Sequence, residues 1–159
     1  IKKNLNSKNL ICVSPDVGGV ERTRALARKL DIGIAIIDKR RPAPGKSQVM
    51  NVIGNVNNKT CIIIDDIIDS GGTIVNAAQA LINRGANEVH VYITHGVLSG
   101  EAVEKIKKSQ IKNLVVTDTI DNSNKLKKAK NIEVLSICNL LGEAIKRISN
   151  STSVSDLFK

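Results

Sequence analysis

Short runs rich in Ile, Val and Leu recur along the chain and are separated by segments of mixed polarity. Their length and β-branched content are typical of buried strands. We predict strands at 10–14, 32–38, 60–65, 88–94, 114–118 and 132–137. Strands that alternate with helical segments indicate a parallel sheet with helical crossovers. The predicted fold class is α/β, with a doubly wound, mostly parallel sheet.

Apolar residues between these runs recur at helical spacing. We predict helices at 20–30, 73–84, 101–108 and 140–148, and Gly85 stands where the second of them would end in a C-cap. The chain shows neither internal repeats nor a convincing linker. Its 159 residues are therefore expected to form a single domain, 1–159.

Two segments break the alternation. Residues 39–48 are basic, contain Pro42, Pro44 and Gly45, and follow a predicted strand without starting a helix, which is typical of a mobile loop. The tail, residues 150–159, is polar but ends in an apolar Leu-Phe pair. We expect that pair to pack at a subunit contact, with a frayed terminus as the alternative.

Composition indicates which residue types form the core and in which cellular compartment the protein is expected. With one Phe, one Tyr and no Trp, the core must be aliphatic. No apolar stretch approaches the ~18 residues that span a bilayer, and no signal-peptide pattern opens the chain, so we expect a cytoplasmic protein without a membrane partner. Cys12, Cys61 and Cys138 lack metal-ligand spacing, and we interpret them as buried free thiols.

The formal net charge of +9 is concentrated in two segments, 105–112 and 125–130, which have the composition of exposed faces. Nucleic acid is disfavoured as a partner because the aromatic side chains that stack on single-stranded bases are almost absent. Phosphorylated small molecules are a simpler explanation of the charge.

The apolar run 62–64 leads directly into two adjacent carboxylates, Asp65 and Asp66. In open α/β sheets, ligands bind beyond the carboxyl ends of the strands, where these side chains are expected to lie. Ionised carboxylates only accept hydrogen bonds, so an adjacent pair suits two vicinal hydroxyl groups, such as those of a ribose.

A phosphate site is predicted directly after this pair, at Asp69, Ser70, Gly71, Gly72 and Thr73. Glycines permit positive φ, and the N–H groups at the start of the following helix favour an anion. A diol site followed by a phosphate site describes a pentose 5-phosphate. In the alternative, the glycines only form a tight turn and the aspartates only cap the helix, but three carboxylates in front of the turn argue against this.

Two further motifs have weaker signals. In "SPDVGG" (14–19), Gly18 and Gly19 can expose N–H groups to a second phosphate, and Asp16 can hold a hydrated Mg²⁺, although the residues alone favour an ordinary strand-to-helix turn. In "DKRRP" (38–42), Lys39, Arg40 and Arg41 offer positive charge for a transferring phosphoryl group on a loop that could close over a nucleotide, although a solvated charge run is the commoner outcome.

Taken in order, the motifs resemble those of the ribose-phosphate pyrophosphokinase (phosphoribosyl pyrophosphate synthetase) family, specifically its C-terminal domain, which has the type I phosphoribosyltransferase fold. The likeness extends over nearly the whole chain. It rests on "VSPDVGGVERTRALARKL", "IAIIDKRRP", "VIGNV", "IDDIIDSGGT", "THGVLSGEAVEKI", "VVTDTI" and the terminal "SVSDLF". Simple phosphoribosyltransferases share the sugar-phosphate loop but lack "SPDVGG", "DKRRP" and "SVSDLF".

The resemblance implies Mg²⁺-dependent transfer of pyrophosphate from ATP to ribose 5-phosphate, which gives phosphoribosyl pyrophosphate for nucleotide biosynthesis. It implies that Asp16 contacts the magnesium and that Lys39 and Arg41 stabilise the transition state, whereas Arg40 points elsewhere. It also implies that Ser153 and Ser155 belong to a regulatory anion site shared between subunits, and hence a homo-oligomer in the full-length form.

Family members have two similar domains, and this chain resembles the second. We therefore expect the chain alone to lack the adenine-binding residues and to be incomplete for catalysis. Two alternatives remain open. One is a phosphoribosyltransferase that consumes phosphoribosyl pyrophosphate, and the other is a non-catalytic partner subunit that binds pentose phosphate.

Overall fold

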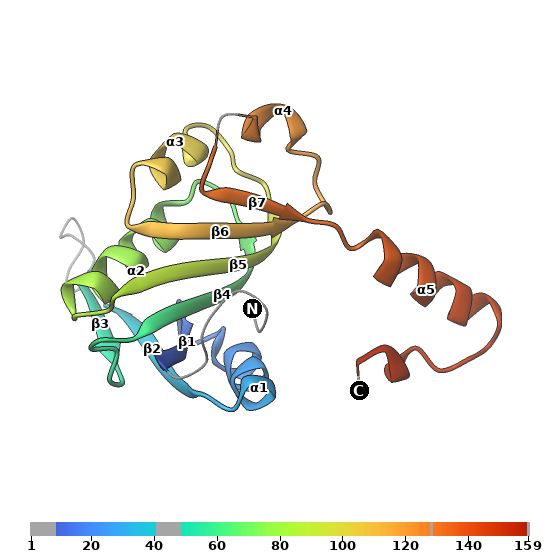
Figure 1. The fold of residues 1–159 in the computed structure, drawn as a ribbon, viewed down its shortest axis with the longest axis horizontal. Coiled ribbons are helices and arrows are strands. Elements are labelled where there is room, and N and C mark those ends of the chain that lie inside the picture. The colour runs from blue at the N-terminus through green and yellow to red at the C-terminus, as the bar shows by residue number, and fades with distance from the viewer. Residues whose placement is uncertain (1–8, 41–48, 128, 159) are drawn as a thin grey trace.

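The computed structural model describes residues 9–40, 49–127 and 129–158, which form a seven-stranded sheet with helices packed against it (Figure 1). The strands are β1 (Leu10–Ser14), β2 (Gly33–Arg40), β3 (Val49–Ile53), β4 (Thr60–Ile68), β5 (Glu88–Gly96), β6 (Ile111–Thr117) and β7 (Ile132–Leu135). The helices are α1 (Val20–Leu30), α2 (Gly72–Asn83), α3 (Ala102–Lys107), α4 (Ser123–Leu126) and α5 (Cys138–Ser149), followed by a 3₁₀-helix at Ser155–Phe158.

The strand order is β3-β2-β1-β4-β5-β6-β7, and all neighbouring pairs are parallel except β2 and β3. From β1 the chain winds through α1 to β2 in one direction, and from β4 it winds through α2 and α3 in the other. Because such crossovers are right-handed, α1 and α2 lie on different sides of the strands (Figure 1). The predicted doubly wound α/β fold is confirmed.

The reversal of winding places a topological switch point between the neighbouring strands β1 and β4. Their register pairs Cys12 with Ile62 and Val13 with Ile63, so both strands end on the same side of the molecule. Ligands of open α/β sheets bind at such a switch point. The segments that follow β1 and β4 are two of those that the sequence singles out.

The core between the sheet and its helices is aliphatic, as predicted. Its largest fully buried side chains include Ile37, Ile62, Ile63, Leu81 and Leu114. The two aromatic side chains of the chain lie outside the buried core, because Tyr92 is half-buried and Phe158 is 59% exposed. Within the described part of the chain, no helix combines the length and apolar character needed to cross a bilayer.

The prediction of a loop from residue 39 onwards is wrong for its first two residues. β2 continues through Lys39 and Arg40, which pair in antiparallel register with Met50 and Val49. The strand continues because β3, which the periodicity did not predict, offers it an edge partner. The rest of the expected loop, residues 41–48, lies outside the described residues, and Arg41 with it.

The predicted end of β4 at residue 65 is also too early. The strand runs to Ile68, since parallel pairing with β5 continues through Asp65, Ile67 and Ile68. Asp65 and Asp66 therefore stand within the last part of the strand rather than beyond it. The α2 boundaries and the C-terminal Gly85, with φ +87°, agree with the prediction within about one residue.

α5 differs from the other helices in projecting away from the sheet beyond the end of β7 (Figure 1). Its apolar side chains are largely exposed, with Ile145 and Ile148 each 67% accessible to solvent. Cys138, at its start, is exposed, so the prediction of three buried thiols holds for Cys12 and Cys61 only.

Candidate functional site

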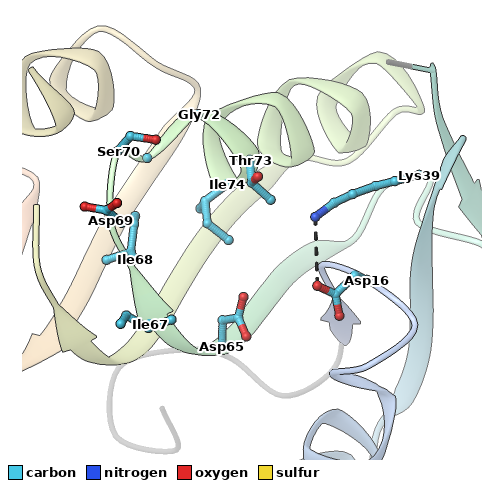
Figure 2. Close-up of a pocket in the computed structure, with 11 residues that line it drawn as sticks. Asp16, Lys39, Asp65, Ile67, Ile68, Asp69, Ser70, Gly72, Thr73 and Ile74 are labelled. Carbon is cyan, nitrogen blue, oxygen red and sulfur yellow. Dashed lines mark ion pairs between the residues drawn. The ribbon is translucent and has the colours of Figure 1, made fainter. Parts of the chain in front are cut away.

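A cavity of about 270 Å³ lies at the carboxyl ends of β1, β2 and β4 (Figure 2). It collects side chains that are far apart in the sequence, because the switch point brings the ends of these strands together. The residues that line it are Asp16, Lys39, Asp65, Ile67, Ile68, Asp69, Ser70, Gly71, Gly72, Thr73 and Ile74.

One wall of the cavity is the start of α2. Gly71 has φ +77°, a conformation that glycine adopts readily, and it precedes the helix without any side-chain cap. The first helical hydrogen bond of this turn runs from the Val75 N–H to the Gly71 carbonyl. The N–H groups of residues 72–74 precede that bond, so the helix start offers donors and a positive dipole end to an anion.

Asp65 and Asp66 have different surroundings. The Asp65 side chain lines the cavity and is 16% exposed, whereas Asp66 is 61% exposed and does not line it. Burial raises the pKa of the Asp65 carboxyl, while a hydrogen bond from Arg22 lowers the pKa of Asp66. The Asp66 amide donates to the Asp65 carboxylate at 3.0 Å.

Arg22 is a residue that the sequence did not single out. Its Nη1 atom lies 3.1 Å from Asp65 Oδ1 and 3.0 Å from Asp66 Oδ1. The available signal was weak: Arg22 stands in the first turn of a helix that starts at the same end of the sheet as the two carboxylates.

The "SPDVGG" segment forms a compact turn around Asp16. Asp16 Oδ1 accepts a hydrogen bond of 2.9 Å from the Gly19 amide, so this N–H is engaged by a carboxylate. A Cβ at Gly19 would lie 2.8 Å from Ser14 Oγ, and glycine is therefore required there by contact. The other oxygen of Asp16, Oδ2, lies 3.9 Å from Lys39 Nζ, and the two side chains share one side of the cavity (Figure 2).

The cavity thus brings together Asp16, Lys39, Asp65 and the 69–73 segment. Gly18, Gly19 and Asp66 adjoin it without lining it. Ser153 and Ser155 are exposed in the tail, where the Ser153 carbonyl accepts from Arg147 and Ser155 begins the 3₁₀-helix.

A magnesium ion is compatible with the donors of this cavity. Among the described residues, no three His, Cys, Asp or Glu side chains gather into a metal-binding group. Mg²⁺ nevertheless keeps several waters and is commonly held by one or two carboxylates together with substrate phosphates. A single carboxylate such as Asp16, opposite a helix start whose N–H groups face the cavity without a side-chain cap, fits that mode.

Comparisons with known proteins agree with the resemblance seen in the motifs. A ribose-phosphate pyrophosphokinase from Rhizobium meliloti (strain 1021) is 58% identical over 158 residues, which are 99% of this chain and 51% of that protein. The chain spans about half the length of the curated relatives it matches.

Solved structures give the same result. The crystal structure of phosphoribosylpyrophosphate synthetase from Mycobacterium smegmatis matches 91% of this chain and 47% of its own, with a TM-score of 0.82 and 35% identity. Adenine phosphoribosyl transferase from Trypanosoma brucei matches 84% of this chain and 59% of its own, with a TM-score of 0.56 and 17% identity, which shows a shared fold alone.

The family itself is shown by a match over most of the chain. The model of the phosphoribosyl synthetase-associated domain covers residues 41–159, which include β4, the 69–73 segment and α2. The chain belongs to the phosphoribosyl synthetase-associated domain family.

Proposed function

We propose that this chain is the ribose-5-phosphate-binding half of a ribose-phosphate pyrophosphokinase, which transfers a pyrophosphoryl group from ATP to O1 of ribose 5-phosphate and releases phosphoribosyl pyrophosphate and AMP. The observation that carries the proposal is the single cavity that joins Asp65 to the uncapped start of α2. The curated relatives named ribose-phosphate pyrophosphokinase support it over nearly the whole chain.

In this proposal, the sugar phosphate binds along the last part of β4 and the start of α2. Asp65 and Asp66 accept hydrogen bonds from the ribose hydroxyl groups, and Asp69 lines the same wall of the cavity. The N–H groups that open α2, together with the Ser70 and Thr73 hydroxyls, donate to the 5-phosphate. Two fixed ends orient the sugar, which lowers the entropic part of the barrier.

The opposite side of the cavity meets the transferring group. Lys39 supplies positive charge there, Arg41 is proposed to do the same, and Asp16 would hold a hydrated Mg²⁺. The ion would neutralise charge on the phosphates of ATP. Gly19 keeps the turn around Asp16 compact, because its amide donates to Asp16 Oδ1 and a Cβ there would meet Ser14 Oγ at 2.8 Å.

The chain alone is proposed to bind ribose 5-phosphate without turning it over. None of the residues that line the cavity is aromatic, so none of them provides a stacking platform for an adenine ring. In the full-length form we propose a homo-oligomer, with Ser153 and Ser155 in a regulatory anion site between subunits. The exposed apolar residues of α5 support an assembly of this kind.

A second candidate function is a non-catalytic subunit that binds pentose phosphate, and it is favoured by the lack of an aromatic side chain among the described residues that line the cavity. The two are distinguished by adding the upstream half of a related pyrophosphokinase and measuring phosphoribosyl pyrophosphate formation. Activity that depends on Lys39 supports the enzyme, and binding without activity supports the partner subunit.

Both candidate functions require that the chain binds ribose 5-phosphate, and calorimetry tests this. We expect ribose 5-phosphate to bind the chain more tightly than ribose or inorganic phosphate alone. Asp65→Asn should weaken binding of ribose 5-phosphate while binding of phosphate is retained, because the substitution removes a charged acceptor and leaves the start of α2 intact. Equal affinities for the phosphate ester in the variant and the parent chain would contradict the assignment.

A further inference from the structure

Arg22 joins two elements that are separate in the sequence. It extends from the first turn of α1 to the end of β4, where one nitrogen, Nη1, contacts both Asp65 Oδ1 and Asp66 Oδ1 at 3.1 and 3.0 Å. A guanidinium NH₂ group carries two hydrogens, so one nitrogen can donate to two carboxylates. Arg22 does not line the cavity itself and approaches the pair from the side of α1.

Two adjacent carboxylates repel each other, and burial of one of them increases the cost of ionising both. Burial raises the pKa of Asp65, whereas donation by Arg22 lowers the pKa of Asp66. Among the described residues, the other charged groups that line the cavity are Asp16, Lys39 and Asp69, and Lys39 is directed at Asp16. Within the described residues, Arg22 is the cation in contact with the pair.

The geometry also leaves room for a ligand. Arg22 and the Asp66 amide both meet Asp65 at the same oxygen, Oδ1. Neither of these two contacts uses Oδ2 of Asp65, whose side chain lines the cavity. The cation therefore neutralises and orients the pair without filling every acceptor position.

We propose that Arg22 is a positioning residue that holds Asp65 and Asp66 together as one ionised acceptor pair for the ribose hydroxyl groups. The inference rests on the proposed function, because it assigns the pair to a diol. It adds that affinity for the sugar depends on a residue that does not touch it. It also predicts that removal of this cation makes binding of the sugar more sensitive to mildly acidic pH.

The test compares the parent chain with Arg22→Gln, Arg22→Lys and a matched control, Arg24→Gln, by calorimetry with ribose 5-phosphate between pH 5 and 8. Arg24 lies on the same helix but lines a different surface, beside Asp31 and Gly33. The ratio of dissociation constants, variant over parent, is taken at each pH, which cancels the ionisation of the phosphate ester itself.

Arg22→Gln is expected to raise this ratio about tenfold near neutral pH, the size of one charge-assisted hydrogen bond. The ratio should rise further towards pH 5, because the carboxyl pair takes up a proton at higher pH once the cation is absent. Arg22→Lys should restore part of the affinity and most of the pH tolerance, and Arg24→Gln should behave as the parent.

A ratio near one for Arg22→Gln at every pH would overturn the proposal, as would tighter binding, which would mean that Arg22 competes with the sugar for the carboxylates. If Arg22→Gln does not fold, carbon NMR of the carboxyl groups in the parent and Arg22→Lys chains decides instead, and an Asp66 that titrates at its ordinary pKa in the parent would refute it. Asp65→Asn distinguishes the proposed function from the role of Arg22. If Asp65→Asn binds ribose 5-phosphate normally, the proposed function fails. If binding is weakened in Asp65→Asn but normal in Arg22→Gln, only the role of Arg22 is refuted.

Discussion

Lys39 Nζ and Asp16 Oδ2 lie 3.9 Å apart on one side of the cavity, although one residue lies near the end of β2 and the other follows β1. The contact exists because β1 and β2 are parallel neighbours, so their carboxyl ends lie side by side. Lys39 is fixed further by its pairing with Met50 on β3. A cation held in this way can meet a transferring phosphoryl group with little rearrangement.

The first prediction concerns this lysine. In a full-length enzyme that contains this chain, Lys39→Ala should lower kcat far more than it raises KM, because the charge is needed mainly in the transition state. Steady-state kinetics with ribose 5-phosphate and ATP provides the measurement. Lys112→Ala, a change at a 65% exposed lysine paired with Glu88, is the control and should have little effect. A rise in KM with unchanged kcat would instead show that Lys39 contributes to substrate binding and not to stabilisation of the transition state.

A second prediction concerns the glycines at the start of α2. Gly71→Ala should lower the free energy of unfolding by about 1 kcal/mol or more, because a Cβ is strained at φ +77°. Gly72→Ala is the matched control, since an added Cβ there meets nothing within 4 Å. Urea denaturation compares the two, and equal stabilities would show that the backbone relaxes without cost.

The third prediction uses the thiols. Burial raises the pKa of Cys12 to about 11 and that of Cys61 to about 12, whereas Cys138 is exposed. A thiol-reactive dye at pH 8 should therefore label Cys138 first and the other two only as the protein opens, and Cys138→Ser should remove the fast phase. Fast labelling of two or more thiols in the folded chain would contradict the burial.

The raised pKa values of Cys12 and Cys61 also predict a loss of stability at alkaline pH. A thiol whose folded pKa is raised holds its proton more tightly when folded, so its contribution is complete below the unfolded pKa of about 8.5. The free energy of unfolding should then fall as pH rises from about 9 towards 11–12. Cys12→Ala should flatten part of this fall in denaturation curves measured at several pH values.

A fourth prediction concerns the tail. Lys29 Nζ donates to the Phe158 carbonyl at 3.2 Å, and the Phe158 side chain is 59% exposed. Deletion of residues 151–159 should reduce self-association, as measured by light scattering, and leave ribose 5-phosphate binding intact. Lys29→Ala removes only the contact with the tail and serves as the comparison. The same oligomer before and after the deletion would exclude an assembly role for the tail.

The sequence predicts the sheet and most of the cavity because those signals are local. An apolar run ends in Asp65 and Asp66, and Gly71 follows within a few residues at a helix start. One short segment therefore contains the carboxylates and the helix start that the fold places at the switch point. Three of the boundaries that were wrong, at Lys39, at Ile68 and at the start of β6, predicted at 114 and found at Ile111, are those at which a neighbouring strand extends the pairing.

Arg22 could not be found in this way. Its distance from Asp65 depends on the register between β1 and β4, which pairs Val13 with Ile63 across a separation of many residues. Nothing in the local pattern of α1 distinguishes Arg22 from Arg24, which lies on another surface of the same helix. Such relationships follow from the arrangement of elements rather than from any one segment.

We propose that ribose 5-phosphate binds in the cavity between β4 and the start of α2, and amide NMR of the labelled chain, titrated with ribose 5-phosphate, measures this binding residue by residue. We expect the largest shifts on Asp65, Asp66 and residues 69–74, with saturation, and a weaker response in Asp65→Asn. Shifts absent from these amides, or concentrated on α5 and the tail, would contradict it.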